Sequence, residues 1–185
     1  AGGNPSILDE PQKTNIILYS SEIDNAAYLK IAGATITANS VLSPDGTQNA
    51  DTLNFSTSIG SRIEQSVNPS VAGDYTFSVY LKSSSPKQVG FRTGISATSI
   101  VTINVTTEWT RFSVTQNLPS VPNTATPQIR SIDSLGGNVF VWGLQIELNQ
   151  NPSSYIPTTT AAVTRNADVI TVSPPAGTVK ITTTF

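Results

Sequence analysis

Six polar or aromatic residues of this 185-residue chain are out of phase with the apolar residues around them and are candidates for ligand contact. An aromatic ring outside the core can stack on the apolar face of a pyranose while charged groups beside it bind the hydroxyls. Tyr80 is the main candidate, beside Lys82 and, if the strand order permits, near Arg92. The alternative is that Tyr80 only packs against a cross-strand neighbour. The full candidate set is Tyr80, Lys82, Arg62, Glu64, Arg92 and Arg130.

The two tryptophans are assigned to packing rather than to ligand contact. Trp142 is in phase with Phe140 and Leu144, which predicts a core position on one face of a strand. Trp109 follows Glu108 at the start of another expected strand, and we expect it to cover the edge of the core.

Catalytic residue types are scarce. The chain has no His and no Cys, which excludes Ser-His-Asp and Cys-His catalysis, thiol nucleophiles and zinc knuckles. A glycosidase needs two carboxylates at a set separation, and Glu64, Glu108 and Glu147 are the glutamates that could meet. Surface glutamates on strands usually stay apart, so we expect a protein that is not an enzyme and that needs no cofactor.

A hard-cation site would need several clustered oxygen ligands. Glu22 and Asp24 are the candidates, but two solvated charges near a turn are the better interpretation, and no metal is expected.

Composition excludes two kinds of partner. Charged residues make up 12% of the chain, against roughly 25% in typical globular proteins, and the net charge is −2. Such a chain has no long-range field to attract nucleic acid or an anionic membrane. No run approaches the roughly 18 apolar residues of a membrane span, so neither a nucleic acid nor a membrane is an expected partner.

Alternating apolar and polar residues predict an all-β fold. The clearest segment is 75–82, in which Tyr75, Phe77, Val79 and Leu81 share one face. The turn Ser43-Pro44-Asp45-Gly46 separates two such segments. One solvated face per strand favours antiparallel sheets, and the close spacing favours a sandwich or barrel. Strands are predicted at residues 16–19, 34–38, 52–56, 62–67, 75–82, 88–93, 99–105, 108–115, 127–132 and 138–148, with one helical turn near residues 24–29.

The two ends of the chain differ from its middle. Residues 1–14 contain Gly2, Gly3, Pro5 and Pro11 and predict an extended leader. Residues 15–148 are the predicted sandwich. Residues 149–185, rich in Thr, Val and Pro, predict an extended arm or the start of a following module. Since the chain begins with Ala, we expect a piece of a longer polypeptide.

Several segments resemble, in the same order along the chain, a recurrent module of tail-fibre, tail-spike and other virion proteins of tailed bacteriophages. The turn Ser43-Pro44-Asp45-Gly46 lies in one of them, and Tyr28 departs from the pattern, which often has Trp there. The segments cover most of the chain; they are residues 5–22, 38–51, 75–82, 108–112, 141–147 and 154–168.

The resemblance implies an antiparallel jelly-roll β-sandwich of the carbohydrate-binding-module type, exposed on the virion surface. Its implied partners are other virion proteins, copies of the same chain up to a trimer, and a host surface glycan. The implied function is structural and adhesive, with no catalytic residues to carry over. The alternative is a purely structural capsid or fibre module, a decoration or spacer without a glycan ligand, whose extended ends attach to neighbours by strand addition.

Overall fold

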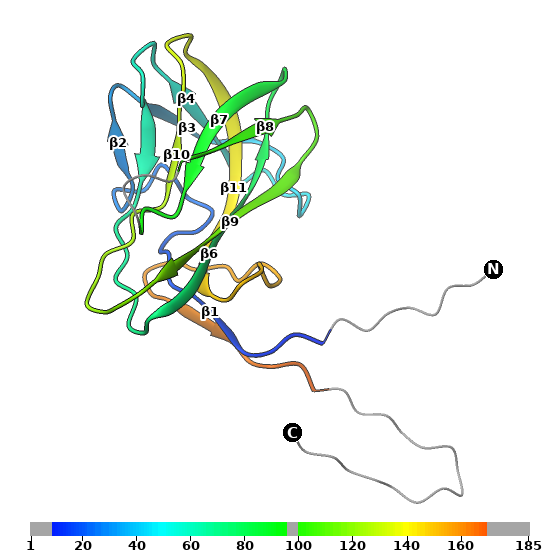
Figure 1. Cartoon of the computed structure of the whole chain (residues 1–185). Helices are drawn as coiled ribbons and strands as arrows, with labels where there is room; N and C mark the ends of the chain where they lie inside the picture. The colour runs from blue at the N-terminus through cyan, green and yellow to red at the C-terminus, as the bar shows by residue number, and fades with distance from the viewer. Residues whose placement is uncertain (1–8, 96–99, 170–185) are drawn as a thin grey trace, which may run out of the picture.

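The computed structural model describes residues 9–95 and 100–169, and there the chain is all-β, with two five-stranded antiparallel sheets packed face to face (Figure 1). Nowhere in these residues does a helix reach the length and apolar character needed to cross a bilayer. The predicted all-β sandwich is confirmed. The first residues of the leader, Ser99 of one predicted strand and the last part of the C-terminal arm lie outside the described residues.

Two sheets and a short ribbon make up the described fold. Sheet I has the order β3 (Thr35–Val41), β4 (Ala50–Phe55), β11 (Gly137–Leu148), β6 (Gly73–Lys82), β9 (Thr110–Leu118). Sheet II has the order β2 (Leu29–Ile31), β5 (Arg62–Glu64), β10 (Gln128–Arg130), β7 (Lys87–Arg92), β8 (Val101–Val105). The end ribbon pairs β1 (Lys13–Asn15) with β12 (Val163–Arg165).

The core lies between the inner faces of the two sheets. Phe77 of sheet I stacks on Phe91 of sheet II with ring centroids 4.5 Å apart, and both rings are buried. Ile63 and Ile129 close the core from sheet II. Because these apolar residues alternate with polar ones along each strand, one face of each sheet is buried and the other is free to carry a site.

Two expectations about the first part of the chain are wrong. Residues 16–19 do not form a strand, because Tyr19 has a left-handed φ of 51° and Asn15 Oδ1 accepts a hydrogen bond from Ile17 N–H. The helical turn expected near residues 24–29 is instead part of a succession of turns. In these turns Asn25 N–H donates to Glu22 O and Tyr28 N–H donates to Asn25 O before β2 begins.

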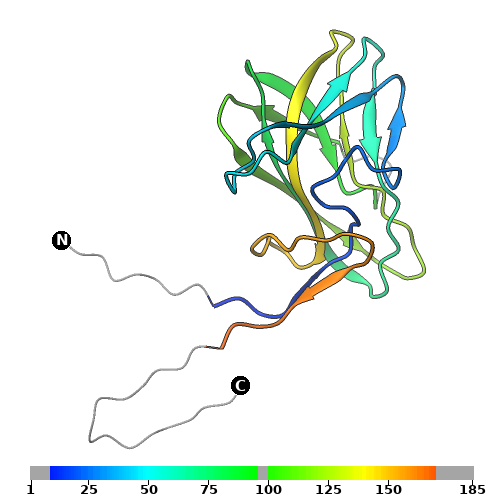
Figure 2. The same ribbon diagram turned by 180° about the vertical axis from the view of Figure 1, so that it is seen from behind.

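The described parts of the two predicted end segments are in contact with each other and with the sandwich. Antiparallel pairing of β1 with β12 makes both leave the domain at the same end (Figure 2). Glu10 forms an ion pair with Arg165, and Ile156 is buried against the sandwich. The division of the chain at residues 14 and 148 stays a prediction, but these segments contribute to the packing of the folded unit.

Candidate functional site

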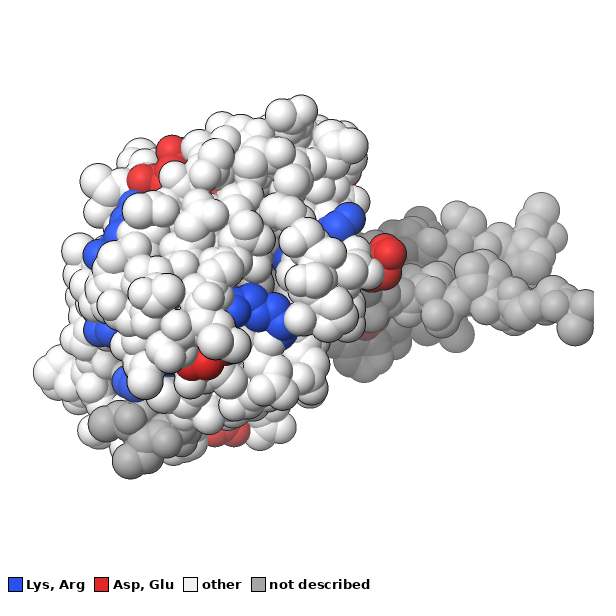
Figure 3. Space-filling view, turned by 90° about the horizontal axis from the view of Figure 1, so that it is seen from above, with Lys and Arg blue, Asp and Glu red and all other residues white. Residues whose placement is uncertain are grey.

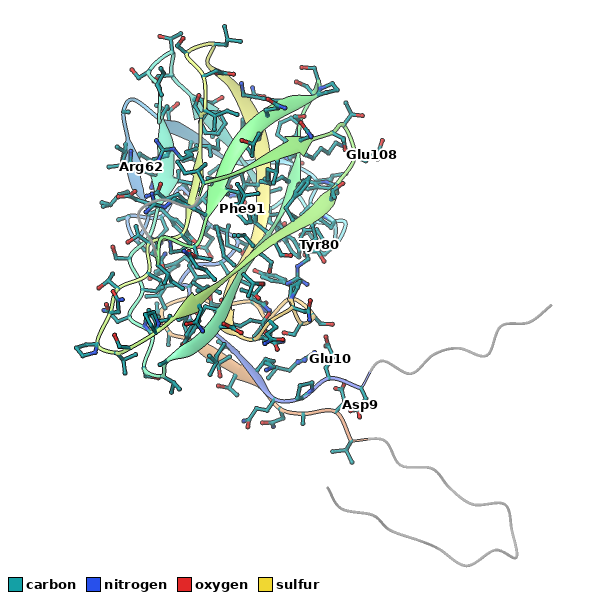
Figure 4. All side chains as sticks on the ribbon, in the orientation of Figure 1. Asp9, Glu10, Arg62, Tyr80, Phe91 and Glu108 are labelled. Atoms are coloured by element: carbon teal, nitrogen blue, oxygen red, sulfur yellow. The ribbon has the colours of Figure 1, made fainter. Side chains whose placement is uncertain are left out.

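The six candidate residues separate into two groups on opposite outer faces. Tyr80 and Lys82 are on β6 of sheet I, whereas Arg62, Glu64, Arg92 and Arg130 are on β5, β7 and β10 of sheet II. Figure 4 shows Tyr80 and Arg62 on opposite sides of the domain, with Phe91 between them.

The expected proximity of Tyr80 to Arg92 is therefore wrong. Although β6 and β7 are consecutive in the chain, they belong to different sheets, and the neighbours of β6 are β11 and β9. The residue that faces Tyr80 on β9 is Arg111.

Trp142 is buried, as expected, but on the outer face of sheet I rather than between the two sheets. Val139 and Val141 point into the core, so Phe140 and Trp142 point out of sheet I. A bulge follows Trp142, where Gly143 adopts φ 66°, and the pairing with β6 resumes at Gln145. The extra residue shifts the alternation, which returns Leu144 and Ile146 to the core.

Three aromatic rings gather on this outer face beside the bulge. Trp142 is opposite Tyr80, with ring centroids 5.5 Å apart, and its centroid is 4.6 Å from that of Tyr155. A Cβ at Gly143 would be 3.2 Å from Tyr80 Cδ2 and 3.5 Å from Tyr155 Cδ2, so the rings rest on the glycine backbone. Tyr80 and Tyr155 are half-buried, which leaves part of each ring in contact with solvent.

Arg111 adds a cation to these rings. Its guanidinium carbon is 5.4 Å from the Tyr80 ring centroid, within the range of a cation–π interaction. Arg111 Nη1 donates to Ser153 O at 2.6 Å, and Nη2 donates to Ser78 Oγ at 3.0 Å. We call the resulting surface the aromatic face; it comprises Tyr80, Lys82, Arg111, Phe140, Trp142 and Tyr155.

Arg111 and Tyr155 were not among the sequence candidates. Arg111 alternates along its strand with Phe112 and Val114, which pack against the core. This alternation predicts that Arg111 lies on the outer face of the sheet, so the sequence did carry a signal for it. Tyr155 belongs to a loop without periodicity, and no sequence signal indicates its place. Trp109, expected at the core edge, is half-buried, and its indole N–H donates to Leu42 O at 3.0 Å.

The loop that carries Tyr155 covers the part of sheet I next to the aromatic face. Beneath it Glu147 is fully buried and accepts hydrogen bonds from Ser153 N–H at 2.8 Å and Ser153 Oγ at 2.7 Å. Tyr155 is anchored by a 2.6 Å hydrogen bond between its hydroxyl and Ser20 Oγ, and burial raises the pKa of Tyr155. The Tyr155 ring is therefore held in place by its own hydrogen bond and packing.

The glutamates that could have formed a catalytic pair are not brought together. Glu64 lies on sheet II, Glu147 is buried on sheet I, and Glu108 is exposed in the turn before β9. Glu22 and Asp24 are exposed, and within residues 9–95 and 100–169 no group of three or more acidic side chains could hold a metal ion.

The second group forms a polar network on sheet II. Glu64 Oε2 accepts from Arg62 Nε and from Gln128 Nε2, each at 2.7 Å. Register places Arg62 opposite Arg130, and Gln128 opposite both Glu64 and Arg92. Burial lowers the pKa of Arg130, the charges of Arg62 and Arg92 lower it further, and the charge of Glu64 raises it. We call this surface the arginine face; it comprises Arg62, Glu64, Arg92, Gln128 and Arg130.

The strand order and the packed inner faces define the class of the fold as the jelly-roll β-sandwich of carbohydrate-binding modules. No protein-family model and no curated protein matches the sequence. The CBM22-1 xylan-binding domain of Paenibacillus barcinonensis Xyn10C is similar, with a TM-score of 0.54 and 15% identity over 75% of this chain and 94% of that domain.

Two larger proteins contain a similar unit. An exo-β-agarase matches with a TM-score of 0.52 and 8% identity over 75% of this chain and 26% of its own. The enzymatically active domain of tailspike protein 4 of bacteriophage CBA120 matches with a TM-score of 0.49 and 12% identity over 71% of this chain and 21% of its own. This chain thus spans only a minor part of either protein. At 15% and 8% identity, the likeness to the xylan-binding domain and to the agarase shows the fold alone.

Proposed function

We propose that this chain is a non-catalytic glycan-binding module and that its site is the aromatic face of sheet I. The observation that carries the proposal is the cluster of Tyr80, Trp142 and Tyr155 with Arg111 beside it. Half-buried rings offer a flat apolar surface for a pyranose, and the Lys82 ammonium can donate to hydroxyls at its edge.

We further propose that the module acts in adhesion on the virion surface of a tailed bacteriophage, with a host surface glycan as ligand. The sequence segments that resemble virion proteins of these phages, in the same order along the chain, support this assignment. So does the pairing of β1 with β12, since a unit whose two ends are adjacent is readily accommodated within a longer fibre polypeptide. Other virion proteins and further copies of this chain are the proposed partners.

A second candidate function is a purely structural virion module without a glycan ligand. It is favoured by the burial of Trp142, which is only 7% exposed and packs between Tyr80 and Tyr155. Rings that already pack on one another stabilise a sheet without any ligand. The two functions differ in whether the purified chain binds a saccharide.

A glycan array followed by calorimetric titration tests the first function. The intact chain should bind a saccharide, and Tyr80→Ala should weaken binding about tenfold, because one stacking surface is removed. Leu29→Ala is the matched control, since Leu29 is 53% exposed on the other sheet and its loss should leave affinity unchanged.

Three outcomes would contradict parts of this proposal. Absence of binding across the array would favour the structural module. Full affinity in Tyr80→Ala would refute the site. Release of reducing sugar from a bound polysaccharide would show an enzyme. Mass spectrometry of purified phage particles, with peptides mapped by position, tests the virion assignment.

A further inference from the structure

We propose that the arginine face of sheet II is a second binding site, which takes the carboxylate or sulfate groups of an acidic saccharide. It lies on the opposite outer face from the aromatic face (Figure 4). Its existence therefore does not depend on the proposed function of the aromatic face.

Two guanidinium groups lie close to Gly60 on this face. Arg62 Nη1 donates to Gly60 O at 3.2 Å, and a Cβ at Gly60 would be 2.7 Å from Arg130 Nη2. Arg62 and Arg130 are also register partners on β5 and β10. Like charges near one residue repel each other, and Glu64 forms its ion pair with Arg62, which makes the Arg130 side of Gly60 the centre of the proposed site.

The side chain of Arg130 is held in position by the backbone beneath it. A Cβ at Gly90 would be 2.8 Å from Arg130 Cγ and 2.9 Å from Ile132 Cγ2, so the arginine stem crosses the sheet where a side chain is missing. At the other end of the stem the guanidinium meets Gly60. Glycines at both contacts let the arginine lie flat, and a guanidinium held in this way loses little freedom when an anion binds.

The carboxylate of Glu64 forms its ion pair with Arg62 rather than with Arg130. Glu64 is engaged with Arg62 Nε and Gln128 Nε2, each at 2.7 Å. Within the described part of the chain Arg130 makes no ion pair, and its Nη1 donates to Gln128 Oε1 at 3.4 Å. The local field at Arg130 is therefore positive and suits an added anion. Figure 3 shows Lys and Arg side chains along the same side of the domain on which Figure 4 labels Arg62.

The chemistry of the face favours an acidic saccharide over a nucleic acid. Planar guanidinium groups match carboxylate and sulfate oxygens, and the Gln88–Asn104 amide pair on the same sheet can bind hydroxyls. A duplex carries one negative charge per roughly 1.7 Å, which requires a long basic track. The chain has only 10 basic residues and a net charge of −2, whereas an acidic saccharide separates its charges by neutral ring atoms.

Titration of the full chain with defined probes tests the proposal. The probes are an oligogalacturonate for carboxylate, dextran sulfate for sulfate, neutral dextran, and a DNA duplex. We expect binding to one or both acidic saccharides that weakens with added salt, and no binding to neutral dextran at this face. Arg130→Gln and Arg62→Gln should each weaken it about tenfold, because a hydrogen bond to a charged group is lost.

Matched variants distinguish a specific site from a general effect of positive charge. Lys13→Gln removes one positive charge from β1, away from both faces, and should leave affinity within twofold. Tyr80→Ala should leave binding of the acidic probe unchanged. The proposal for the aromatic face and the proposal for the arginine face can therefore be refuted separately. Unchanged thermal unfolding of Arg130→Gln would show that the variant is folded. In NMR spectra the Nε–H resonances of Arg62 and Arg130 should shift on titration.

The proposal would be overturned by any of three results. These are the absence of binding to both acidic probes, equal weakening by Lys13→Gln and Arg130→Gln, and DNA binding that is tighter than saccharide binding and lost in Arg130→Gln.

Discussion

Asn15 shows how a single buried side chain joins three segments of the chain. Its Nδ2 donates to Leu144 O at 3.1 Å and to Ile156 O at 2.8 Å. Its Oδ1 accepts from Ile17 N–H at 3.2 Å and from Ile146 N–H at 3.1 Å. The amide thus satisfies four backbone groups that neither sheet pairs, where the end ribbon meets β11 and the loop of Tyr155.

Replacement of Asn15 by Ala is expected to destabilise the protein by about 3 kcal/mol or more, because four buried backbone groups lose their partner. Urea denaturation measures the change. Thr14→Ala is the control: its hydroxyl shares an exposed hydrogen bond with Thr164, so the loss should be below about 1 kcal/mol. Equal losses of unfolding free energy in the two variants would show that water can replace the Asn15 amide.

The bulge in β11 is the feature of one element that creates the aromatic face. Before the bulge Trp142 points outward, and after it Leu144 and Ile146 point inward. Without the extra residue at Gly143, either the indole or the two aliphatic side chains would be on the wrong side of sheet I. A left-handed φ of 66° and the closeness of two rings both favour glycine there.

Gly143→Ala should lower the free energy of unfolding by about 1–2 kcal/mol, because alanine disfavours the left-handed backbone conformation. It should also displace the rings of Tyr80 and Tyr155. Gly46→Ala is a matched control, since Gly46 has φ 85° and no atom within 4 Å of its Cβ position. Both variants should lose stability in urea, but only Gly143→Ala should change the near-ultraviolet circular dichroism of the aromatic cluster. Identical spectra for the two variants would contradict this account of the bulge.

At the scale of the whole molecule, the two sheets depend on a segment that follows their last strand. The loop of Tyr155 covers the fully buried Gln145 and Glu147. Gln145 Oε1 accepts from Ile156 N–H at 2.7 Å, and Thr158 Oγ1 donates to Ile17 O at 2.6 Å. The sandwich is complete only when this segment is in place.

A chain ending at residue 148 keeps every strand of both sheets, yet its free energy of unfolding should fall by about 4 kcal/mol or more. Ile156 no longer buries its side chain, and the buried Glu147 loses the hydrogen bonds from Ser153 while it keeps the one from Gln145. For a domain of this size that lowers the melting temperature by about 10 °C. A chain ending at residue 169 retains all described contacts and serves as the control in thermal unfolding. Equal melting temperatures of the two chains would support the predicted boundary at residue 148.

The sequence by itself determined the fold class and most strands. Alternation of large apolar residues with polar ones predicts segments that overlap β3 to β11, and Phe77 and Leu81 are buried as their phase requires. Ser43 to Gly46 forms the expected turn, in which hydrogen bonds from Ser43 and Thr47 lower the pKa of Asp45 to about 2. These features depend on neighbours in the chain, so a local pattern is enough to predict them.

Only the tertiary structure decided which side chains meet. Tyr80 faces Arg111 rather than Arg92 because strand order is set by packing between segments distant in the chain. Trp142 is buried on the outer face of sheet I rather than between the sheets, because one extra residue in a bulge shifts a period of two, and the sequence around Gly143 does not indicate that shift. Tyr155 joins the aromatic face from a loop without periodicity. Each of these placements depends on long-range contacts, whereas alternation along a strand reports only which face a residue occupies.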